Sequence, residues 1–185
     1  MPYRKPAYKN HYYHVYNRGN NYEPIFYNQQ NYHFFLRRLL LYFENKINLV
    51  AYCLMPNHYH LLLEILEDDF LQKAMQKFST SYTKAINKEQ NRVGHLFQGR
   101  YKSKLVPDNN YLLHLSRYIH LNPVKAGLVQ NPQDWFFSSY LDFINIRKSE
   151  FLNLEIISSQ IQDYRYFVMS FQEEQNYYLK DLLFD

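Results

Sequence analysis

The 185-residue sequence is poor in cysteine and glycine, and it has no long apolar run. Its one cysteine, Cys53, excludes an internal disulfide framework and fits a reducing compartment. Its four glycines form no Gly-rich loop of the kind that cradles phosphates, which argues against a nucleotide-binding enzyme. No apolar stretch approaches the roughly 20 residues that span a bilayer, and the first residues, "MPYRKPAYKN", lack the apolar segment of a signal peptide. We therefore expect a soluble, cytoplasmic protein.

Aromatic residues and an uneven charge distribution are what the sequence does contain. It has 20 tyrosines and 14 phenylalanines, and its 46% hydrophobic and 21% charged content is typical of a globular chain. The net charge of +4 is divided unevenly: residues 1–105 hold 15 basic and 7 acidic residues, whereas residues 106–185 hold 6 and 10. We expect an anionic partner to bind the basic part.

The hydrophobic pattern predicts an α+β fold. Strands are expected at 11–17, 47–54, 58–65 and 95–106, and helices at 28–46, 69–89 and 107–122. This β-α-β-β-α-β-α order, with a central hairpin turned by "MPN", is the ferredoxin-like arrangement. It predicts one antiparallel four-stranded sheet with two helices on one face and a third helix that crosses or flanks it. Asp108 is expected to cap that third helix, and Pro123 to end or kink it.

Two histidines, His58 and His60, stand one residue apart at the start of the predicted strand 58–65. Residues two apart in a strand share a face, so these side chains project together, as a metal or a phosphate would require. Tyr59, Leu61 and Leu63 are expected to line the opposite face of the strand. By itself such a short pattern is explained more simply as two polar residues on a half-exposed strand.

The helix predicted over 107–122 adds a second group of polar residues. His114, Tyr118 and Asn122 follow at four-residue spacing and so lie on one face of the helix. A tyrosine and an amide one turn apart offer a phenolic nucleophile and a neutral oxygen ligand. The alternative is a tyrosine packed on the sheet and an asparagine that caps the helix before Pro123.

Basic residues alternate in the predicted strand 95–106. Arg100, Lys102 and Lys104 are expected to line one face of this strand, where they could contact a row of phosphates. The alternative is an exposed edge strand that lysines protect from further pairing. Arg18 and Asn20, at the turn after the first strand, would add further donors.

Several stretches, taken in order, resemble one family. "YHVYNRGN" (13–20), "YCLMPNHYHLLLE" (52–64), "GHLFQGRYKS" (94–103), "YIHLNPVKAGLV" (118–129) and "DWFFSSY" (134–140) are similar to segments of the single-tyrosine HUH transposases. The likeness is greatest to the REP-associated tyrosine transposases and the related insertion-sequence transposases. It covers residues 11 to about 145, roughly three quarters of the chain, and residues 146–185 match nothing in that family.

The resemblance implies a role for particular residues. His58 and His60 are similar to the metal ligands of the family, Tyr118 to the nucleophile, and Asn122 stands where a polar third ligand is expected, often Gln in the insertion-sequence members. It implies a catalytic domain over 1–129, and the amphipathic pattern of the rest predicts that 130–185 form a mostly helical extension packed on it. The implied substrate is single-stranded DNA with a hairpin, cut to a 5′-phosphotyrosine and a free 3′-OH. DNA contacts are expected from Arg18, Asn20, Arg100, Lys102, Lys104 and Lys125.

This chemistry explains why such residues are needed. A phenol has a pKa near 10, so Tyr118 is a poor nucleophile at pH 7 without help. A divalent metal, Mg²⁺ or Mn²⁺, held by His58 and His60 would stabilise the charge that develops on the phosphate. The histidines must be neutral to bind a metal, so activity is expected to fall below about pH 6. His114, His120 or a water on the metal are the candidates for a general acid or base.

Two other functions remain open from the residues alone. Ferredoxin-like sheets with exposed aromatics also form modules that bind single-stranded nucleic acid without cutting it, and a domesticated transposase would look the same. A zinc hydrolase built on the histidine pair ranks last, because such sites draw further ligands from a larger barrel. The oligomeric states implied by the family resemblance are a monomer, as among REP-associated members, or a homodimer that exchanges the tyrosine helix, as among insertion-sequence members.

Overall fold

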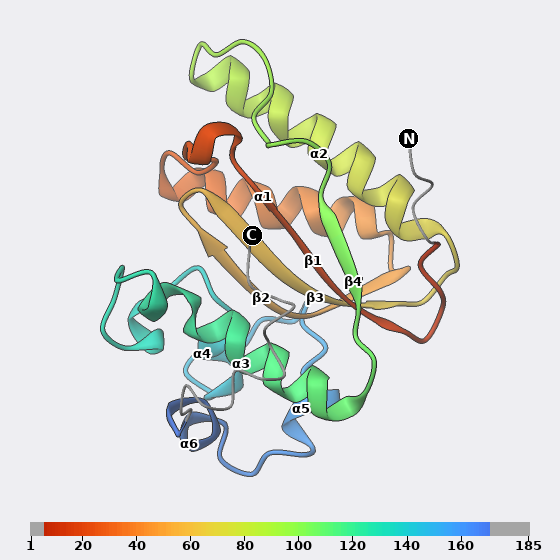
Figure 1. Ribbon diagram of the computed structural model, residues 1–185, viewed down its shortest axis with the longest axis vertical. Helices are drawn as coiled ribbons and strands as arrows, with labels where there is room; N and C mark the ends of the chain where they lie inside the picture. Colours follow the sequence, from red (N-terminus) through yellow and green to blue (C-terminus); the bar gives the residue numbers. More distant parts are fainter. Residues whose placement is uncertain (1–5, 171–185) are drawn as a thin grey trace.

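The structure, a computed structural model, describes residues 6–170 and contains one four-stranded sheet (Figure 1). Neighbouring strands are antiparallel and follow the order β2-β3-β1-β4. This is the strand order of the ferredoxin-like arrangement, so the predicted α+β fold is confirmed. The strands are β1 (Tyr12–Arg18), β2 (Ile47–Met55), β3 (His58–Ile65) and β4 (Lys102–Leu105).

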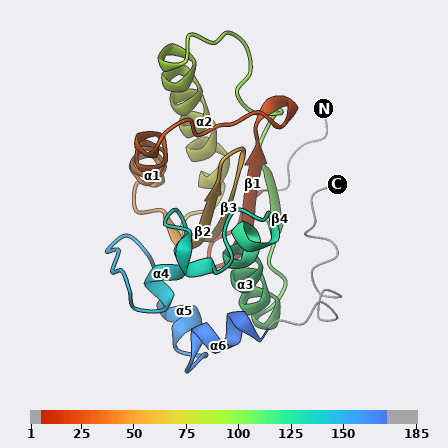
Figure 2. The same cartoon turned by 90° about the vertical axis from the view of Figure 1, so that its left-hand side faces the viewer.

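Helices cover both faces of this sheet (Figure 2). The two helices expected on one face, α1 and α2, are present there, and α3 lies against the other face. The long helices are α1 (Gln29–Phe43), α2 (Phe70–Glu89) and α3 (Asn109–Lys125). The short ones are η1 (Asn20–Tyr22), η2 (Pro132–Asp134), α4 (Tyr140–Phe143), α5 (Glu155–Ser158) and α6 (Tyr164–Met169).

Strand β3 divides its side chains between two hydrophobic cores. Tyr59, Leu61 and Leu63 are buried between the sheet and the α1–α2 layer, whereas Leu62 is buried on the α3 side. The alternation of a strand produces this division, because successive residues point to opposite faces. Burying one such side chain stabilises the fold by roughly 1.5–3 kcal/mol. The strand that carries the histidine pair is therefore anchored from both sides.

The fourth strand is much shorter than predicted. Instead of running over 95–106, regular pairing with β1 is confined to Lys102–Leu105. Before it, Leu96 and Phe97 turn inward to the core, and Gly99 adopts a φ of +93° that an extended strand cannot contain. A single bridge between Gly19 and Phe97 is what remains of the expected pairing there.

Helix α3 begins as predicted but ends later. The side chain of Asp108 accepts a hydrogen bond from Tyr111 N at 2.8 Å, which confirms the predicted cap. The helix continues through Pro123 to Lys125 instead of ending at residue 122. Proline removes a backbone donor from this turn. The amide Nδ2 of Asn122 donates to the carbonyl of Tyr118 at 2.9 Å and so supplies a side-chain donor beside it.

Residues 130–170 form short helices and loops that pack on β2 and α3 (Figure 1). Within this part of the chain, residues 137–139 lie along β2. Leu54 N donates to Phe137 O at 2.9 Å, and Ser139 N donates to Tyr52 O at 3.0 Å. The helical extension expected over 130–185 includes residues 171–185, which lie outside the described part of the chain.

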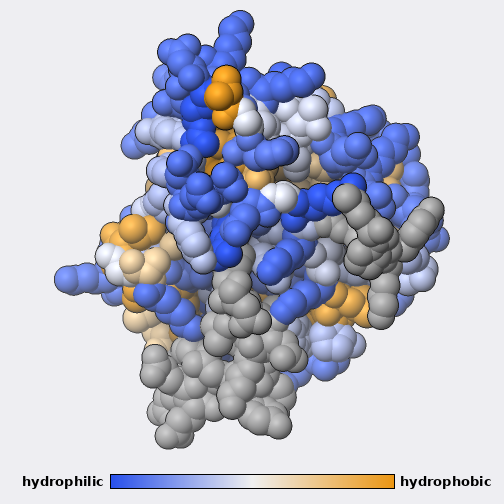
Figure 3. All heavy atoms as spheres, turned by 45° about the horizontal axis from the view of Figure 1, so that its top comes forward, coloured by the Kyte–Doolittle hydropathy of each residue, from blue (hydrophilic) through white to orange (hydrophobic). Residues whose placement is uncertain are grey.

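The exposed surface is largely hydrophilic on the face that includes the end of α2 and the loop after it (Figure 3). Among the described residues, no helix is both long enough and apolar enough to cross a membrane.

Candidate active site

The histidine pair lies on the sheet face that packs against α3. A tight hairpin places it there, because Met55 pairs directly with His58 and only Pro56 and Asn57 form the turn. Gly19 N donates to the carbonyl of Asn57 at 2.7 Å, which ties this turn to the end of β1. The rings of His58 and His60 are 5.2 Å apart between centroids and nearly perpendicular. Both imidazoles thus face the same side, as the strand alternation predicts.

Tyr118 lies beside this pair in the same chain. Its ring centroid is 5.6 Å from that of His60, and the two planes meet at 88°. Tyr118 is buried, and Lys125, two turns further along α3, holds its Nζ 5.3 Å from the centre of the tyrosine ring. Two segments nearly 60 residues apart in sequence therefore meet at one place.

Strand β1 contributes His14 and Tyr16, which the sequence reasoning did not include in the site. His14 Nε2 is 2.9 Å from His60 Nδ1, and the His14 ring stacks on Tyr16 with 4.7 Å between centroids. Tyr16 pairs with His60 in the register of β1 and β3. The alternation of β1 already puts His14 and Tyr16 on one face. Their place next to His60 follows only once the register of this pairing is known.

Burial keeps all three histidines neutral. It lowers the pKa of His58 to about 4, with the charge of Arg18 as a second cause, and that of His14 to about 3, with help from Lys104. The pKa of His60 is held well below its ordinary value, first by burial and then by His14 and His58. Neutral imidazoles are the form that binds a metal.

The same environment keeps Tyr118 protonated. Burial, followed by the nearby Tyr16, raises the pKa of Tyr118 to about 12, and a hydrogen bond with Asn122 acts in the opposite direction. A phenol at this pKa is a weak nucleophile at neutral pH unless a cation stabilises its anion.

The histidine pair offers two nitrogen ligands that suit a divalent metal, but few other ligands from the described part of the chain lie around it. Within residues 6–170, no group of three or more His, Cys, Asp or Glu side chains is arranged to hold a metal ion. The histidine pair would therefore need a neutral oxygen as a further ligand. Asn122, one turn beyond Tyr118 and nearly buried, is the residue that α3 places in that neighbourhood. Two imidazoles and an amide oxygen would leave positions for water and substrate.

The two histidines considered as acid or base have partners other than Tyr118. His120 points to the opposite flank of the helix, where its ring nitrogens are 2.7 Å from Tyr164 Oη and 2.7 Å from Ser139 Oγ. His114 Nδ1 lies 3.2 Å from a guanidinium nitrogen of Arg117. With both of its ring nitrogens occupied, His120 is not available to Tyr118, and the structure does not support it as the general base.

The predicted DNA-binding cations are divided between two places. Lys102 and Lys104 stand on the histidine side of β4: Lys102 Nζ is 5.9 Å from the Tyr16 ring, and Lys104 lowers the pKa of His14. Arg100 instead borders a hollow beside α2, so the expectation that three cations line one face is wrong. Arg100 precedes β4, which begins at Lys102, so the strand alternation that Lys102 and Lys104 follow does not extend to Arg100.

Arg18 and Asn20 lie at the end of β1. The Arg18 guanidinium covers the ring of Tyr22 at 4.2 Å and donates to the side chain of Gln98. Asn20 N donates to Leu96 O at 2.9 Å. Arg18 pairs with His58 in the register of β1 and β3, which places its backbone at the edge of the candidate site.

Two curated proteins are similar to this chain in sequence. A curated putative REP-associated tyrosine transposase of Haemophilus influenzae is 32% identical over 101 residues, covering 49% of this chain and 57% of that protein. A REP-associated tyrosine transposase of Escherichia coli is 26% identical over 91 residues, covering 49% and 52%. This chain thus spans about half the length of the curated relatives it matches.

A solved structure and a family model extend the comparison. The structure of a REP-associated tyrosine transposase bound to a REP hairpin superimposes with a TM-score of 0.67 at 20% identity, covering 78% of this chain and 86% of that one, and so shares the fold. The family model described as "Transposase IS200 like" matches residues 7–122, which include β1, the histidine pair, Tyr118 and Asn122. The chain therefore belongs to the IS200-like transposase family.

Proposed function

We propose that this protein is a metal-dependent transposase or nickase that cuts and rejoins single-stranded DNA, with Tyr118 as the nucleophile. The observation that carries the proposal is the position of Tyr118, whose ring lies 5.6 Å from that of His60 within one chain of an IS200-like transposase. A tyrosine so close to two neutral imidazoles is placed to attack a phosphate that a cation holds there.

The reaction would join Tyr118 to DNA. The phenolic oxygen of Tyr118 releases its proton to solvent and attacks a phosphorus atom, the bond from that phosphorus to the 3′ oxygen breaks, and the departing oxygen takes up a proton from solvent to become a 3′-OH. The phosphotyrosine conserves the energy of the broken phosphodiester, so a 3′-OH can attack it and reseal the strand without a nucleotide cofactor. This agrees with the absence of a Gly-rich phosphate loop from the sequence.

The residues around Tyr118 would supply what a buried phenol needs. His58 and His60, with Asn122, would hold a divalent metal such as Mg²⁺ or Mn²⁺. Such an ion polarises the phosphate and stabilises its transition-state charge when bound. The ammonium of Lys125, 5.3 Å from the ring of Tyr118, favours the phenolate that must form.

The substrate would be single-stranded DNA that carries a hairpin, as in the complex of the structural relative. Lys102, Lys104 and Lys125 stand near the candidate site and would contact its phosphates. Because Tyr118 meets the histidine pair of its own chain, we propose that a monomer can carry out the cleavage step.

Covalent adduct formation tests this function. The protein is incubated with a hairpin oligonucleotide and Mn²⁺ or Mg²⁺, and the adduct is measured as a shifted band on a denaturing gel. We expect the adduct with wild type and with Tyr166→Phe, whose tyrosine is 72% exposed on α6. We expect none with Tyr118→Phe, and none when EDTA removes the metal. Metal-independent binding without any adduct would refute the proposal and indicate a non-catalytic module.

A further inference from the structure

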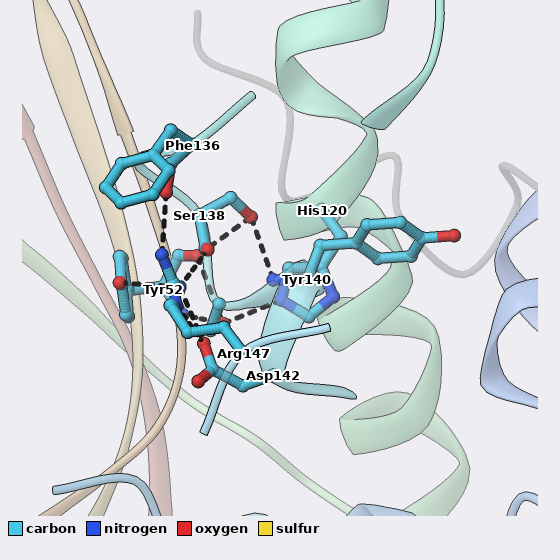
Figure 4. Close-up of polar contacts among 8 residues, drawn as sticks. Tyr52, His120, Phe136, Ser138, Tyr140, Asp142 and Arg147 are labelled. Carbon is cyan, nitrogen blue, oxygen red and sulfur yellow. Dashed lines mark hydrogen bonds and ion pairs between the residues drawn. The ribbon is translucent and has the colours of Figure 1, made fainter. Parts of the chain in front are cut away.

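A buried polar chain connects α3 to the edge of the sheet, on the flank of the helix that faces away from the histidine pair. His120 of α3 reaches the segment beside β2 that contains Ser138 and Tyr140 (Figure 4). The segment "FSSY" belongs to the stretch 134–140, for which the proposed reaction has no use. Polar groups buried this deeply cost free energy unless they are hydrogen-bonded, so their arrangement calls for a reason.

Ser139 joins this segment to β2. The Tyr52 backbone N–H donates to Ser139 Oγ at 2.8 Å, and Ser139 N donates to the Tyr52 carbonyl at 3.0 Å. The neighbouring residue, Ser138, forms a bridge with Cys53 in the same register. Two hydrogen bonds therefore hold Ser139 to the backbone of Tyr52, and Ser139 is fully buried.

From Ser139 the chain runs through His120 to Tyr164 and returns to α3. Ser116 Oγ donates to Leu113 O at 2.8 Å, and Tyr164 Oη donates to Ser116 Oγ at 2.9 Å. The Tyr164 oxygen must then accept from His120 Nδ1–H, 2.7 Å away. In a neutral imidazole the other nitrogen is an acceptor, so His120 Nε2 accepts from the hydroxyl of Ser139 at 2.7 Å.

The hydroxyl hydrogen of Ser139 is assigned to the 2.7 Å bond with His120 and not to the longer 3.2 Å contact with the Tyr52 carbonyl, so each hydrogen in this chain has one place. Burial lowers the pKa of His120 to about 3, with the charge of Arg147 as a second cause, which agrees with a neutral ring. The bonds run in one direction from the backbone of β2 to the backbone of α3. A network whose every member is satisfied is rigid, because any shift of the helix would break at least one of its bonds.

Arg147 stabilises the conformation of residues 136–142. Its guanidinium donates to Phe136 O at 2.8 Å, to the Tyr52 hydroxyl at 3.1 Å and to Asp142 Oδ2 at 2.6 Å (Figure 4). Asp142 is only 2% exposed, so this ion pair is well shielded from water. Ser139 lies between residues 136 and 142 and is thus fixed on a loop that cannot easily move relative to β2.

Tyr118 and His120 are two residues apart on α3 and so face opposite flanks of one helix. One flank faces the histidine pair, and the other is fastened to the sheet through Ser139. We propose that Ser139 and His120 form a brace that sets the position of Tyr118 over the His58–His60 pair, which makes them positioning residues for strand cleavage. This inference rests on the proposed function.

The test separates positioning from DNA binding and from stability. Ser139→Ala removes the hydroxyl, Ser139→Thr restores it, and Ile86→Val is the control. Ile86 is fully buried in α2, on the far side of the sheet. Its truncation to valine costs ~0.5–1.5 kcal/mol of folding stability, which is comparable to the cost expected for Ser139→Ala. For each variant, the rate of adduct formation at saturating hairpin oligonucleotide is compared with the Kd for that oligonucleotide. Temperatures stay below every unfolding midpoint.

We expect Ser139→Ala to slow adduct formation by roughly 10- to 100-fold, because a shift on the order of 1 Å is enough to misplace a nucleophile. Its Kd should stay within about twofold of wild type, Ser139→Thr should recover most of the rate, and Ile86→Val should keep it. Tyr164→Phe, which breaks only the distal link, should give a smaller loss. A rate that falls no further than in the Ile86→Val control, or a Kd that worsens in parallel, would overturn the proposal.

A second readout needs no catalysis. The ring of Tyr118 stands edge-on to that of His60, so its NMR signals are sensitive to their relative position. We expect the ring signals of labelled Tyr118 to move in Ser139→Ala but not in Ile86→Val. If wild type forms no adduct, the proposed function fails while this measurement still decides the brace. Unchanged Tyr118 signals in Ser139→Ala would then refute it.

Discussion

Replacing His14 with phenylalanine removes the polar group that contacts the candidate ligand His60. His14 Nε2 is 2.9 Å from His60 Nδ1, and its other ring nitrogen has no hydrogen-bond partner within residues 6–170. The substitution therefore deletes one hydrogen bond but keeps an aromatic ring, which can still stack on Tyr16. We expect it to leave the fold intact and to weaken metal binding.

The size of the effect follows from the burial of both rings. His14 and His60 are completely buried, so the His60 nitrogen loses a partner that water cannot replace. An unsatisfied buried group of this kind costs about 1–3 kcal/mol of stability. Groups that orient a metal-binding histidine typically contribute 10- to 100-fold to metal affinity. We expect His14→Phe to raise the Kd for Mn²⁺ by a factor in that range.

Calorimetric titration of the protein with Mn²⁺ measures this change. The matched control is His33→Phe, because His33 lies on the exposed side of α1, away from the histidine pair. His60→Ala should abolish specific binding, and His14→Gln, whose amide oxygen can still accept a hydrogen bond from His60 Nδ1–H, should fall between wild type and His14→Phe. If His14→Phe binds Mn²⁺ as tightly as wild type while His60→Ala does not, the hydrogen bond has no orienting role and the reasoning is refuted.

Three further predictions concern charge. Lys125→Ala removes the ammonium 5.3 Å from the Tyr118 ring and should slow adduct formation about tenfold at pH 7, with partial recovery at higher pH. The control Lys148→Ala, in the loop after α4, should leave the rate of adduct formation unchanged. Replacing Lys102 and Lys104 by alanine should reduce the slope of log K for single-stranded DNA against log salt by about 0.7 for each lost phosphate contact, as measured by fluorescence anisotropy. Buried His120 has a pKa lowered to about 3, so the unfolded chain takes up its proton first. Stability should fall as pH drops from about 6.5 towards 3, by about 2–3 kcal/mol for this residue at pH 4.5. Because His14, His58 and His60 also have lowered pKa values, urea unfolding at pH 7 and pH 4.5 compares wild type with His120→Gln, and an equal loss in both proteins would mean that His120 is already charged in the fold.

The sequence predicts the parts of this fold whose causes are local. The alternation of β3 and the two-residue turn before it place His58 and His60 on one face, and a helical period places Tyr118 and Asn122 on one side of α3. Each pattern depends on neighbours within a few residues. The family resemblance then brings the two groups together, and the structure places Tyr118 and His60 side by side.

Features that depend on distant segments could not be read in the same way. The contact of His14 with His60 requires the register of β1 against β3, which joins residues 46 positions apart. The late start of β4, at Lys102, is caused by the inward turn of Leu96 and Phe97 into a core that α2 and β3 help to form. His120 was considered as an acid or base because histidine titrates near neutral pH. Only its partners Ser139 and Tyr164 show that it is a neutral, buried link.

The division of charge along the sequence has a different meaning in three dimensions. Several acidic residues of the second part are engaged by local partners: Asp108 and Asp163 cap α3 and α6, and the buried Asp142 pairs with Arg147. Carboxylates at helix N-termini are partly neutralised by the helix dipole, so they repel an anion less than carboxylates elsewhere on the surface would. Lys125, from the same acidic part, stands instead beside Tyr118. The local charge at the candidate site is therefore more positive than the acidic composition of residues 106–185 suggests, and this should draw a phosphate towards Tyr118.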